Sequence, residues 1–581
     1  MKKYGQKFQK FGKYWRVSRI SPYYKNKGER TDGEMYRPVS NLVRVGMICE
    51  KVVAEQLLEH FTGNNLWHPN HHGFRPNHST ATALIQMYDM WLNGAENGEL
   101  TAALLLDLSA AFDLVDHQIL LGKLRLYNFS EDTLAWFVSY LHDRVQYVLV
   151  ESSLSDPQPT GDIGVPQGSI LGPLLYLIFD NDFPAARQEI DNRNGENEAG
   201  DNRDNSTAGE QEPDNRDNNE FPIVVLDPVT TVRQESVARD RVNNNGDNRS
   251  GEREERDNRE NVTAGVSVLY ADDDTDNITA PTIEILGAKV QKEADLSTRW
   301  VRDNCLVCSP DKTKLLVMSP PGQQLRQPGE LLTVNVCGMV VTETTEEKLL
   351  GIGISSNMTW HKYLFGITGN KDFPGLVKKL SQRVGMLQQV AKLLPRDKLK
   401  LITNGIFFFK LIYCLQVFGN CWGINGIGDM DENDRRSVSF TKHHCNILQI
   451  LENKVLRLLT GHGYDVPIKQ LLEESGQMSV QQLVCYHTLL TIFKVVRTGE
   501  PRYLAGRLGV DQIVQERGRT GRRQHDIRLN YELSISRAGT LYRGKILWNS
   551  LPVTIRTVTT ISRFKRMVKE WIKNNIRIRP T

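Results

Sequence analysis

Apolar residues run without a break over 100–107 and then recur at helical spacing to residue 127, in LTAALLLDLSAAFDLVDHQILLGKLRLY. This pattern predicts a buried strand followed by a helix, with Asp107 at the carboxyl end of the strand. A further strand is predicted from residue 145, followed by turns at Pro and Gly positions and by a helix from about Ser169.

The pattern resumes after residue 262. VSVLYADD predicts a strand that runs into a turn, 296–319 predicts a helix end, a loop and a strand, and 347–360 predicts a short hairpin. From about residue 376 the spacing is mainly helical. This order predicts an α+β fold in which helices cover one face of a sheet. The most apolar stretch, 405–418, contains Lys410 and is too short to span a bilayer, so it predicts a buried helix and no membrane partner.

Residues 185–262 interrupt this organisation. The triplet DNR recurs in them among Asn, Glu and Gly, with a single aromatic residue, Phe221. Such a segment has too little apolar surface to offset the entropy of ordering it, so we expect a disordered acidic insertion within one domain. It could act as an interaction arm or be a passive expansion.

The net charge of +3 over 581 residues conceals an uneven distribution. Residues 1–30 carry ten Lys and Arg against one Glu, and 497–581 carry 19 against six acidic residues, whereas 185–262 carry 11 Arg against 20 Asp and Glu. The basic ends favour a polyanion as partner, although solvated helix faces would give the same counts. No targeting signal is visible, so we expect an intracellular protein, nuclear and cytoplasmic.

Eight cysteines are scattered along the chain, which predicts no disulfides. Cys305 and Cys308 have the spacing of metal ligands, but no second pair follows within the range of a zinc site, so a zinc site there is not favoured.

Acidic residues end two of the predicted strands. Asp107 ends the first, and Asp272 and Asp273 follow the strand 267–270, which we expect beside it. Three converging carboxylates need a cation, and their hard oxygen ligands suit Mg²⁺ or Mn²⁺. Two such ions can activate a hydroxyl and stabilise leaving pyrophosphate, as nucleotidyl transfer requires. The alternative is that these are ordinary turn aspartates.

The motifs along the chain resemble those of one family. In order they are WRVSRISPYYKNKGERTDGEMYRPVSN, HHGFRPNHSTATAL, LLLDLSAAFDLVDH, GVPQGSILGPLLY, YADD, SPDKTKLLVMS and KLLGIGISSNMTW. Together they resemble the reverse transcriptases of non-LTR, LINE-type retrotransposons, and two C-terminal stretches, 394–423 and 541–572, are similar to elements of the CR1/L2 type. Because the chain starts at the first motif, we expect it to lack the endonuclease that such elements carry upstream.

The resemblance implies a right-hand polymerase fold, in which the fingers and a palm with an antiparallel sheet occupy 1–355. A helical thumb-like region, 361–460, and a mainly helical, basic C-terminal region, 461–581, would follow. The implied activity is RNA-directed DNA polymerisation, which extends a DNA 3′ end on an RNA template with dNTPs. The implied partners are therefore an RNA template, a DNA primer or target, and dNTPs.

The resemblance also implies catalytic roles. Asp107, Asp272 and Asp273 would bind two Mg²⁺ or Mn²⁺ ions, and Lys312 would protonate the leaving pyrophosphate, a role that its neighbour Lys314 could also fill.

Other motif residues would bind nucleotide, primer or template. Phe112 would lie under the deoxyribose and exclude a 2′-hydroxyl, although a core phenylalanine fits the same position. Arg75 would face the template or serve the fold. The nucleotide-binding candidates are Lys27, Arg37, Leu108, Phe112, Gln167 and Gly168, with Lys25 as a further phosphate ligand, and the primer and template candidates are Arg75, Tyr270 and Gly351.

Two features depart from the family pattern. The insertion at 185–262 precedes the YADD motif, and Asp274 and Asp276 add acidic groups directly after it. A catalytically inactive remnant that only binds nucleic acid is therefore the alternative function. An RNA-dependent RNA polymerase would use a similar palm, but Phe112 argues against it.

Overall fold

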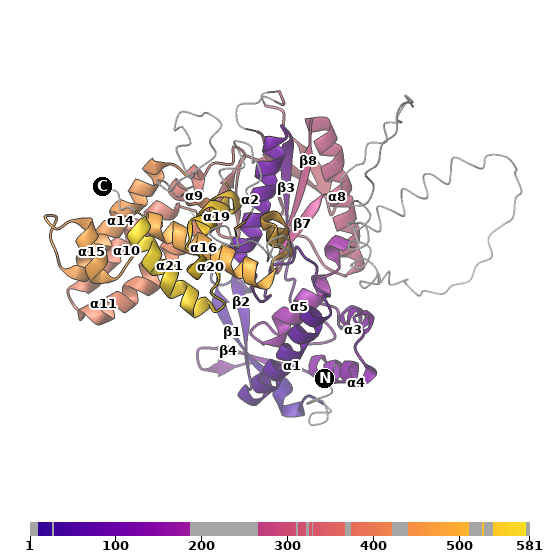
Figure 1. Cartoon of the computed structure of the whole chain (residues 1–581). Coiled ribbons are helices and arrows are strands. Elements are labelled where there is room, and N and C mark those ends of the chain that lie inside the picture. Colours follow the sequence, from indigo (N-terminus) through magenta and orange to yellow (C-terminus); the bar gives the residue numbers. More distant parts are fainter. Residues whose placement is uncertain are drawn as a thin grey trace, which may run out of the picture.

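The computed structural model describes ten segments of the chain, which are residues 10–25, 28–185, 265–309, 312–320, 325–327, 329–366, 373–420, 440–510, 526–527 and 539–576. The insertion expected at 185–262 lies, apart from its first residue, outside the described residues. Figure 1 shows a central sheet with helices on either side, a second group of strands and helices below it, and a helical part at the left.

The central sheet has the strand order β10-β11-β9-β3-β8-β7. Its strands are β3 Leu100–Asp107, β7 Val266–Tyr270, β8 Asp273–Ala280, β9 Lys314–Met318, β10 Thr333–Val336 and β11 Met339–Thr344. Neighbours are antiparallel except β9 and β11, which pair in parallel. The sheet is therefore mixed, and the antiparallel pattern expected from the sequence holds for every other pair.

Helices cover both faces of this sheet, so the prediction of helices on one face was wrong. Ala103 and Leu105 of β3 pack into a core shared with α2, Thr80–Glu96. Leu104 and Leu106 pack into a second core with α5, Leu171–Asp180, and α8, Ile283–Asp303. Because successive side chains of a strand point to opposite faces, a continuous apolar run indicates burial on both.

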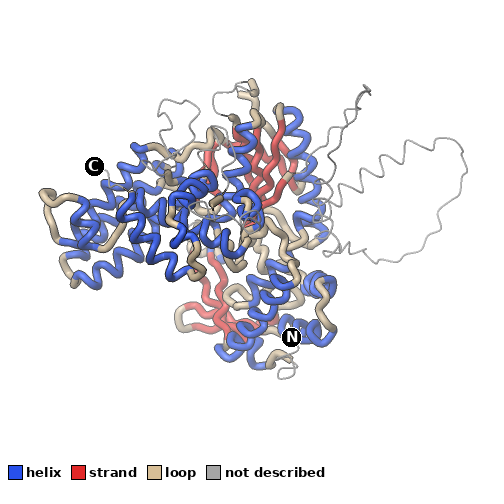
Figure 2. The backbone as a smooth tube through the Cα atoms, viewed as in Figure 1, coloured by secondary structure: helices blue, strands red, loops and turns tan. Residues whose placement is uncertain are grey.

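A smaller sheet lies below the central one, visible as the lower group of red strands in Figure 2. It has the order β2-β1-β4-β5, with β6 also paired to β4. Its strands are β1 Val17–Tyr24, β2 Tyr36–Leu42, β4 Val145–Val150, β5 Ser153–Leu154 and β6 Gln158–Pro159. The accompanying helices are η1 Lys13–Arg16, η2 Gly33–Met35, α1 Arg44–Gly63, α3 His117–Leu126 and α4 Glu131–Leu141.

Beyond the hairpin of β12, Glu346–Leu349, and β13, Ile352–Ser355, the described chain is helical. Its helices are α9 His361–Phe365, α10 Leu376–Ala391, α11 Arg396–Thr403, η3 Asn404–Phe408, α12 Phe409–Ile412, α13 Leu415–Phe418, α14 Lys442–Thr460, α15 Ile468–Ser475, α16 Val480–Thr498, α17 Arg502–Leu508, α19 Thr540–Ser550, α20 Val553–Arg556 and α21 Ile561–Asn575. Except in α15, whose Leu471 and Leu472 form a separate cluster with Leu456, their apolar side chains join those of α2 in one core. The helical part is therefore packed against the central sheet.

Local sequence signals set the ends of the long helices. The side chains of Thr441 and Ser479 cap the first turns of α14 and α16, each in a reciprocal capping box. Gly461 and Gly499 end the same helices in the left-handed conformation, which glycine adopts without strain.

Several predicted elements are confirmed. The strand ending at Asp107, the strand from 145 and the hairpin at 347–360 are present as β3, β4 and β12–β13. The prediction of a single buried helix over 405–418 was wrong. The helix is interrupted at Cys414, which has a φ of +54°, and the side chain of Phe409 is exposed. Short helices occupy this stretch instead.

By length and composition alone, Arg396–Phe418 could cross a membrane, and less than half of its most apolar window is buried. A single stretch of this kind is also typical of a core helix in a soluble protein. Its Phe407, Leu411 and Leu415 side chains lie in the core shared with α2. The absence of a membrane partner stays a prediction.

The sulfur atoms of Cys308 and Cys337 lie together as a disulfide pair. Whether two adjacent thiols are oxidised depends on the redox state of the compartment. The expectation of no disulfides therefore also stays a prediction.

Candidate active site

The three aspartates that end predicted strands meet at one edge of the central sheet. Asp107, the last residue of β3, is the direct neighbour of Asp273, the first residue of β8. Asp272 lies in the tight turn before β8, where Ala271 has a φ of +60°. We expected the strand before the turn, β7, to lie beside β3. The neighbour of β3 is instead β8, the strand after the turn.

Partial burial and mutual repulsion raise the pKa of both turn carboxyls. Removal from water, with the charges of Asp272 and Asp107, raises the pKa of Asp273 to about 6. The pKa of Asp272 is also raised, by loss of water and by Asp107. This edge therefore carries excess negative charge that a cation would relieve.

Lys312 brings one positive charge to this edge. Its Nζ atom donates a hydrogen bond to Asp107 Oδ1 at 2.8 Å, and its side chain remains half exposed. Lys314, the alternative from the sequence, lies within β9 opposite Leu105. Lys312 is therefore the lysine that contacts a carboxylate of this edge.

The additional acidic residues Asp274 and Asp276 are buried, unlike Asp272 and Asp273. Asp276 Oδ1 accepts a hydrogen bond from Ser267 Oγ at 2.6 Å, and its Oδ2 accepts one from Ser297 Oγ of α8 at 3.4 Å. Because alternate residues of a strand share a face, Asp274 is on the same side as Asp276. These two residues belong to the protein interior.

The segment before α5 is fixed to β2 and to the loop after β3. The backbone N–H of Ser40 donates to the carbonyl of Gln167 at 2.7 Å, and Gln167 Nε2 donates to both carboxylate oxygens of Asp113, at 3.0 and 2.9 Å. Gly168 has a φ of +112°, and a Cβ there would lie 2.7 Å from the carbonyl oxygen of Ser40. Asp113, which sequence reasoning missed, therefore sets the orientation of Gln167.

Phe112 and Leu108 lie between the aspartates and this segment. The ring of Phe112 is half buried and stacks on Tyr176 of α5, with centroids 4.8 Å apart and planes 23° apart. Leu108 is buried, and its backbone forms an isolated antiparallel β-bridge with that of Cys308. Both residues are held by packing, so their backbones are fixed relative to Asp107.

The cationic candidates of the smaller sheet differ in placement. Arg37 is exposed on β2, and its charge lowers the pKa of Asp272, against the larger effects that raise it. Lys25 Nζ donates to the carbonyl of Glu34 at 2.8 Å. Lys27 lies outside the described residues. Arg37 is thus the candidate of this group that the structure relates electrostatically to the aspartates.

Gly351 and Tyr270 adjoin the helical part. Leu350 and Gly351 form the turn of the β12–β13 hairpin, both with positive φ, of 47° and 80°. The Tyr413 hydroxyl donates to the Leu350 carbonyl at 2.6 Å. Tyr270 is half buried against the same core. The hairpin and the YADD turn are thereby connected to the helices that follow.

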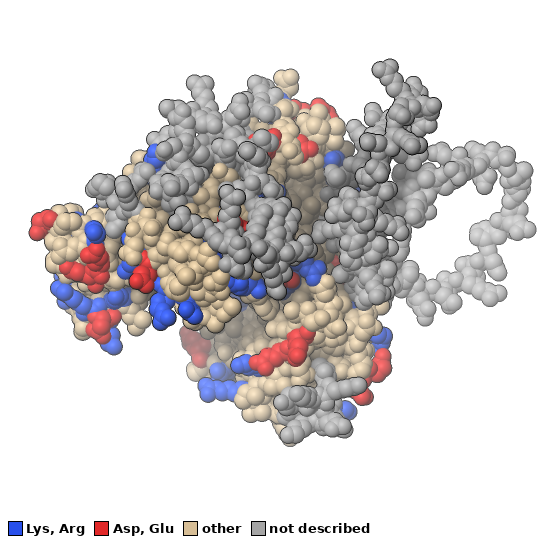
Figure 3. All heavy atoms as spheres, viewed as in Figure 1, with Lys and Arg blue, Asp and Glu red and all other residues tan. Residues whose placement is uncertain are grey.

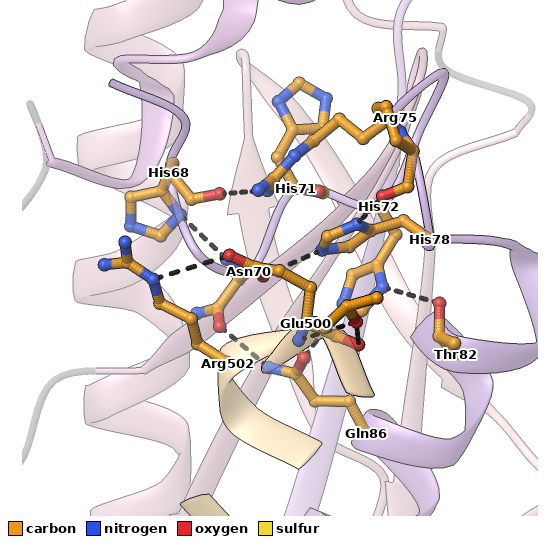
Figure 4. A network of polar contacts seen from close by, with 12 residues as sticks. His68, Asn70, His71, His72, Arg75, His78, Thr82, Gln86, Glu500 and Arg502 are labelled. Carbon is orange, nitrogen blue, oxygen red and sulfur yellow. Dashed lines mark hydrogen bonds and ion pairs between the residues drawn. The ribbon is translucent and has the colours of Figure 1, made fainter. Parts of the chain in front are cut away.

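A histidine-rich loop, 68–78, contacts the YADD turn through its backbone, and Figure 4 shows the polar contacts of its side chains. The backbone N–H of His72 donates to Leu269 O at 2.8 Å, and a Cβ at Gly73 would lie 2.6 Å from the backbone nitrogen of Ala271. His72 is itself held by Thr82 and Gln86, at 3.0 and 2.9 Å from its two ring nitrogens. This contact was missed from the sequence, although the motif HHGFRPNHST was noted.

Arg75 belongs to the same loop. Its Nη1 atom donates to the carbonyls of His68 and His71, each at 2.8 Å, and burial lowers its pKa to about 10. Glu500, from the segment before α17, approaches His78 at 3.7 Å (Figure 4). The hydrogen bonds of Arg75 are therefore with the loop itself, and its guanidinium lies over the Trp67 ring.

Three carboxylates thus lie on adjoining strand ends of a mixed sheet, with an ammonium beside them. Residues 25–193 match the family of reverse transcriptases (RNA-dependent DNA polymerases). These residues are therefore similar to a reverse transcriptase domain, and the predicted resemblance to the reverse transcriptases of LINE-type retrotransposons is confirmed.

Similar proteins are known from Drosophila melanogaster. The chain is 34% identical over 176 residues to a probable RNA-directed DNA polymerase from transposon BS, which is 30% of this chain and 19% of that protein. It is 24% identical over 456 residues to the RNA-directed DNA polymerase from mobile element jockey, which is 78% of this chain and 38% of that protein. It is 29% identical over 178 residues to a probable RNA-directed DNA polymerase from transposon X-element, which is 31% of this chain and 19% of that protein. The chain thus spans well under half of the length of each.

Proposed function

We propose that the chain is an RNA-directed DNA polymerase of a retrotransposon, which extends a DNA 3′ end along an RNA template by consuming dNTPs. One observation carries the proposal: Asp107 is the direct neighbour of Asp273 across β3 and β8, with Asp272 on the adjoining turn. The similarity to polymerases of mobile elements supports it.

The donor set at this edge fits hard divalent cations. Carboxylate oxygens are the ligands that Mg²⁺ and Mn²⁺ prefer, and the raised pKa of Asp273 indicates that the edge lacks compensating charge. Asp107, Asp272 and Asp273 would hold two such ions. When bound, two metal ions of this kind activate the attacking hydroxyl and neutralise charge on the transferred phosphoryl group.

The surrounding residues would select and orient the nucleotide. Arg37, with Lys25 or Lys27, would bind the triphosphate, since guanidinium and ammonium groups pair with phosphate oxygens. The Leu108 carbonyl would adjoin the metals. Gln167, oriented by Asp113, would contact the sugar, and Gly168 would allow close backbone approach.

Phe112 would lie beneath the deoxyribose, where its stacked ring leaves no room for a 2′-hydroxyl. Lys312 would donate a proton to the leaving pyrophosphate, because its ammonium lies beside Asp107 and remains open to solvent. Each of these roles follows from a held position next to the aspartates.

Primer and template would pass between the two sheets and the helices. In this reading the smaller sheet forms the fingers, the central sheet the palm, and the helices after β13 the thumb. Tyr270 and Gly351 would adjoin the primer, and Arg75 would shape the loop beneath them. On the face shown in Figure 3, Lys and Arg side chains gather near the border between the upper and lower parts, together with acidic side chains.

Primer extension tests the proposal. The full chain is incubated with a DNA primer annealed to RNA, dNTPs and Mg²⁺ or Mn²⁺, beside an Asp272→Asn/Asp273→Asn variant. Extension by the wild type and a loss of at least about a hundredfold in the variant are expected. Salt-dependent RNA binding without extension by either protein would contradict the proposal and indicate a protein that only binds nucleic acid.

A further inference from the structure

A second group of potential metal ligands lies outside the aspartate edge. His117 is the first residue of α3, His142 follows the last residue of α4, and Asp162 lies in the loop that leads to the Gln167 segment. One ligand atom from each residue lies within 4.8 Å of the other two. Three separate elements therefore converge at this point.

His117 is positioned as a metal-ligating histidine would be. Its side chain is almost fully buried, at 1% exposed, and its Nε2 atom lies 2.8 Å from the carbonyl oxygen of Gly164. A carbonyl only accepts, so Nε2 carries the proton and Nδ1 keeps a free lone pair. Nδ1 is buried and has no hydrogen-bond partner among the described residues.

A metal would provide the partner that Nδ1 lacks. Histidines that bind metal commonly donate their other ring N–H to a backbone carbonyl, which fixes the tautomer and the ring orientation. Burial also lowers the pKa of His117, which favours the neutral imidazole that metal binding needs.

The other two side chains are accessible from solvent. His142 Nδ1 lies 3.0 Å from Asp162 Oδ1, and the two side chains are 24% and 78% exposed. The imidazoles of His117 and His142 meet edge to face with centroids 5.3 Å apart. An ion could therefore enter from the side of Asp162 and reach the buried nitrogen.

We propose that His117, His142 and Asp162 form a binding site for one divalent transition-metal ion of the zinc type, with water as the fourth ligand. Two imidazoles and one carboxylate suit Zn²⁺, whereas Mg²⁺ and Ca²⁺ prefer oxygen donors throughout. Ligand atoms around tetrahedral zinc lie about 3.3 Å apart, so the group, whose ligand atoms lie within 4.8 Å of one another, would contract when it binds the ion.

The site would stabilise the segment that carries Gln167. The backbone N–H of His117 donates to Asp162 O at 3.1 Å, and Gly164, two residues further on, bonds to the His117 ring. A bound ion would join α3, α4 and this loop, and would reduce the freedom of the chain before Gln167. This role is structural and does not depend on the proposed polymerase activity.

Titration of the metal-free full chain with Co²⁺ tests the site, because tetrahedral cobalt gives characteristic visible absorption. We expect the protein to bind one equivalent of Co²⁺ with the absorption bands of tetrahedral cobalt. Zn²⁺ should displace this Co²⁺ and abolish the bands. His142→Ala and Asp162→Asn change accessible side chains and should each weaken binding at least about tenfold. A rise in melting temperature with Zn²⁺ should be present in the wild type and lost in His142→Ala.

Two controls locate the ion. His443→Ala removes an exposed imidazole elsewhere, and Asp272→Asn/Asp273→Asn removes carboxylates of the aspartate edge. Both variants should still bind one equivalent of tetrahedral Co²⁺. Wild-type protein without tetrahedral bands, or His142→Ala and Asp162→Asn variants that bind cobalt as tightly as the wild type, would overturn the proposal. Circular dichroism spectra that match the wild type establish that the variants fold.

Discussion

Asp273 combines a proposed catalytic role with an electrostatically unfavourable charge. Its neighbours Asp272 and Asp107 and its partial burial raise its pKa to about 6, while Lys312 and Lys348 lower it in part. An aspartate in the unfolded chain titrates near 3.8, so the folded protein holds this proton more tightly. The contribution of this group to the free energy of unfolding is therefore fully present below about pH 4, and it is lost as the pH rises through about 6.

This loss of stability with rising pH leads to a prediction for the metal-free protein. Asp273→Asn removes the charge that causes the loss, so it should raise the melting temperature in EDTA by about 1 to 3 °C at pH 8, since water screens part of the repulsion. At pH 5 the gain should be much smaller. Melting curves of both proteins at the two pH values measure it, and a gain that is the same at both would show that Asp273 does not titrate as described.

Phe112 provides a prediction about sugar selection. Phe112→Ala should raise the use of rNTPs relative to dNTPs by roughly ten- to a hundredfold, because the ring no longer occupies the space of the 2′-hydroxyl. Single-nucleotide incorporation with each substrate measures the ratio. Tyr176→Phe, which keeps the stacked ring and removes only a hydroxyl, is the control and should leave the ratio unchanged.

At the scale of elements, the loop from Gly164 to Gly168 shows how backbone geometry restricts substitution. Gly168→Ala combines a positive φ with a Cβ 2.7 Å from Ser40 O, so it should cost more than about 1 kcal/mol and displace Gln167. Primer extension and thermal unfolding should both decline. Gly385→Ala, in the middle of α10 with nothing within 4 Å of the new Cβ, is the matched control and should be neutral or stabilising.

Elements with a clear apolar pattern could be predicted from the sequence. β3 is apolar on both faces, so its limits and the position of Asp107 followed directly. β8 was missed as a strand because its sequence, DDTDNITA, is polar. Two of its buried polar residues have partners from other elements: Trp91 Nε1 donates to Asn277 Oδ1 at 2.7 Å, and Asp276 accepts from Ser267. Such long-range partners are not visible in a local pattern.

The site itself was predicted unevenly for a similar reason. The three aspartates belong to recognisable motifs and lie at the ends of predicted strands. Asp113 and the loop 68–78, in contrast, act through contacts that only the folded chain creates. Asp113 is exposed and isolated in the sequence, yet it orients Gln167, 54 residues away.

For the whole molecule, the contact between α2 and α17 joins parts of the chain far apart in sequence. Arg507 Nε donates to Asp89 Oδ2 at 2.8 Å, and the Tyr503 hydroxyl donates to the same oxygen at 2.8 Å. Asp89 is buried, so this carboxylate depends on both partners for compensation. The C-terminal helices are thus fixed to the half of the chain that carries Asp107.

Arg507→Gln should therefore lower the free energy of unfolding by about 2 kcal/mol, less than for a fully buried pair because Arg507 is partly exposed. Chemical denaturation measures the loss, and limited proteolysis should release C-terminal fragments first. Arg125→Gln, which breaks an exposed pair with Glu131, should leave stability unchanged. Equal effects of the two variants would argue against a stabilising role for the α2–α17 contact.

The core that α2 shares with the C-terminal helices has a consequence for biosynthesis. The core that covers one face of the central sheet extends through later helices to Ile572 and Ile576, which are synthesised long after the three aspartates. Until then, apolar residues of α2 and β3 lack their final partners and are open to aggregation. A nascent chain or genomic copy that stops shortly after β13 would keep all three aspartates yet have an uncovered face, so we expect it to be insoluble without help from chaperones.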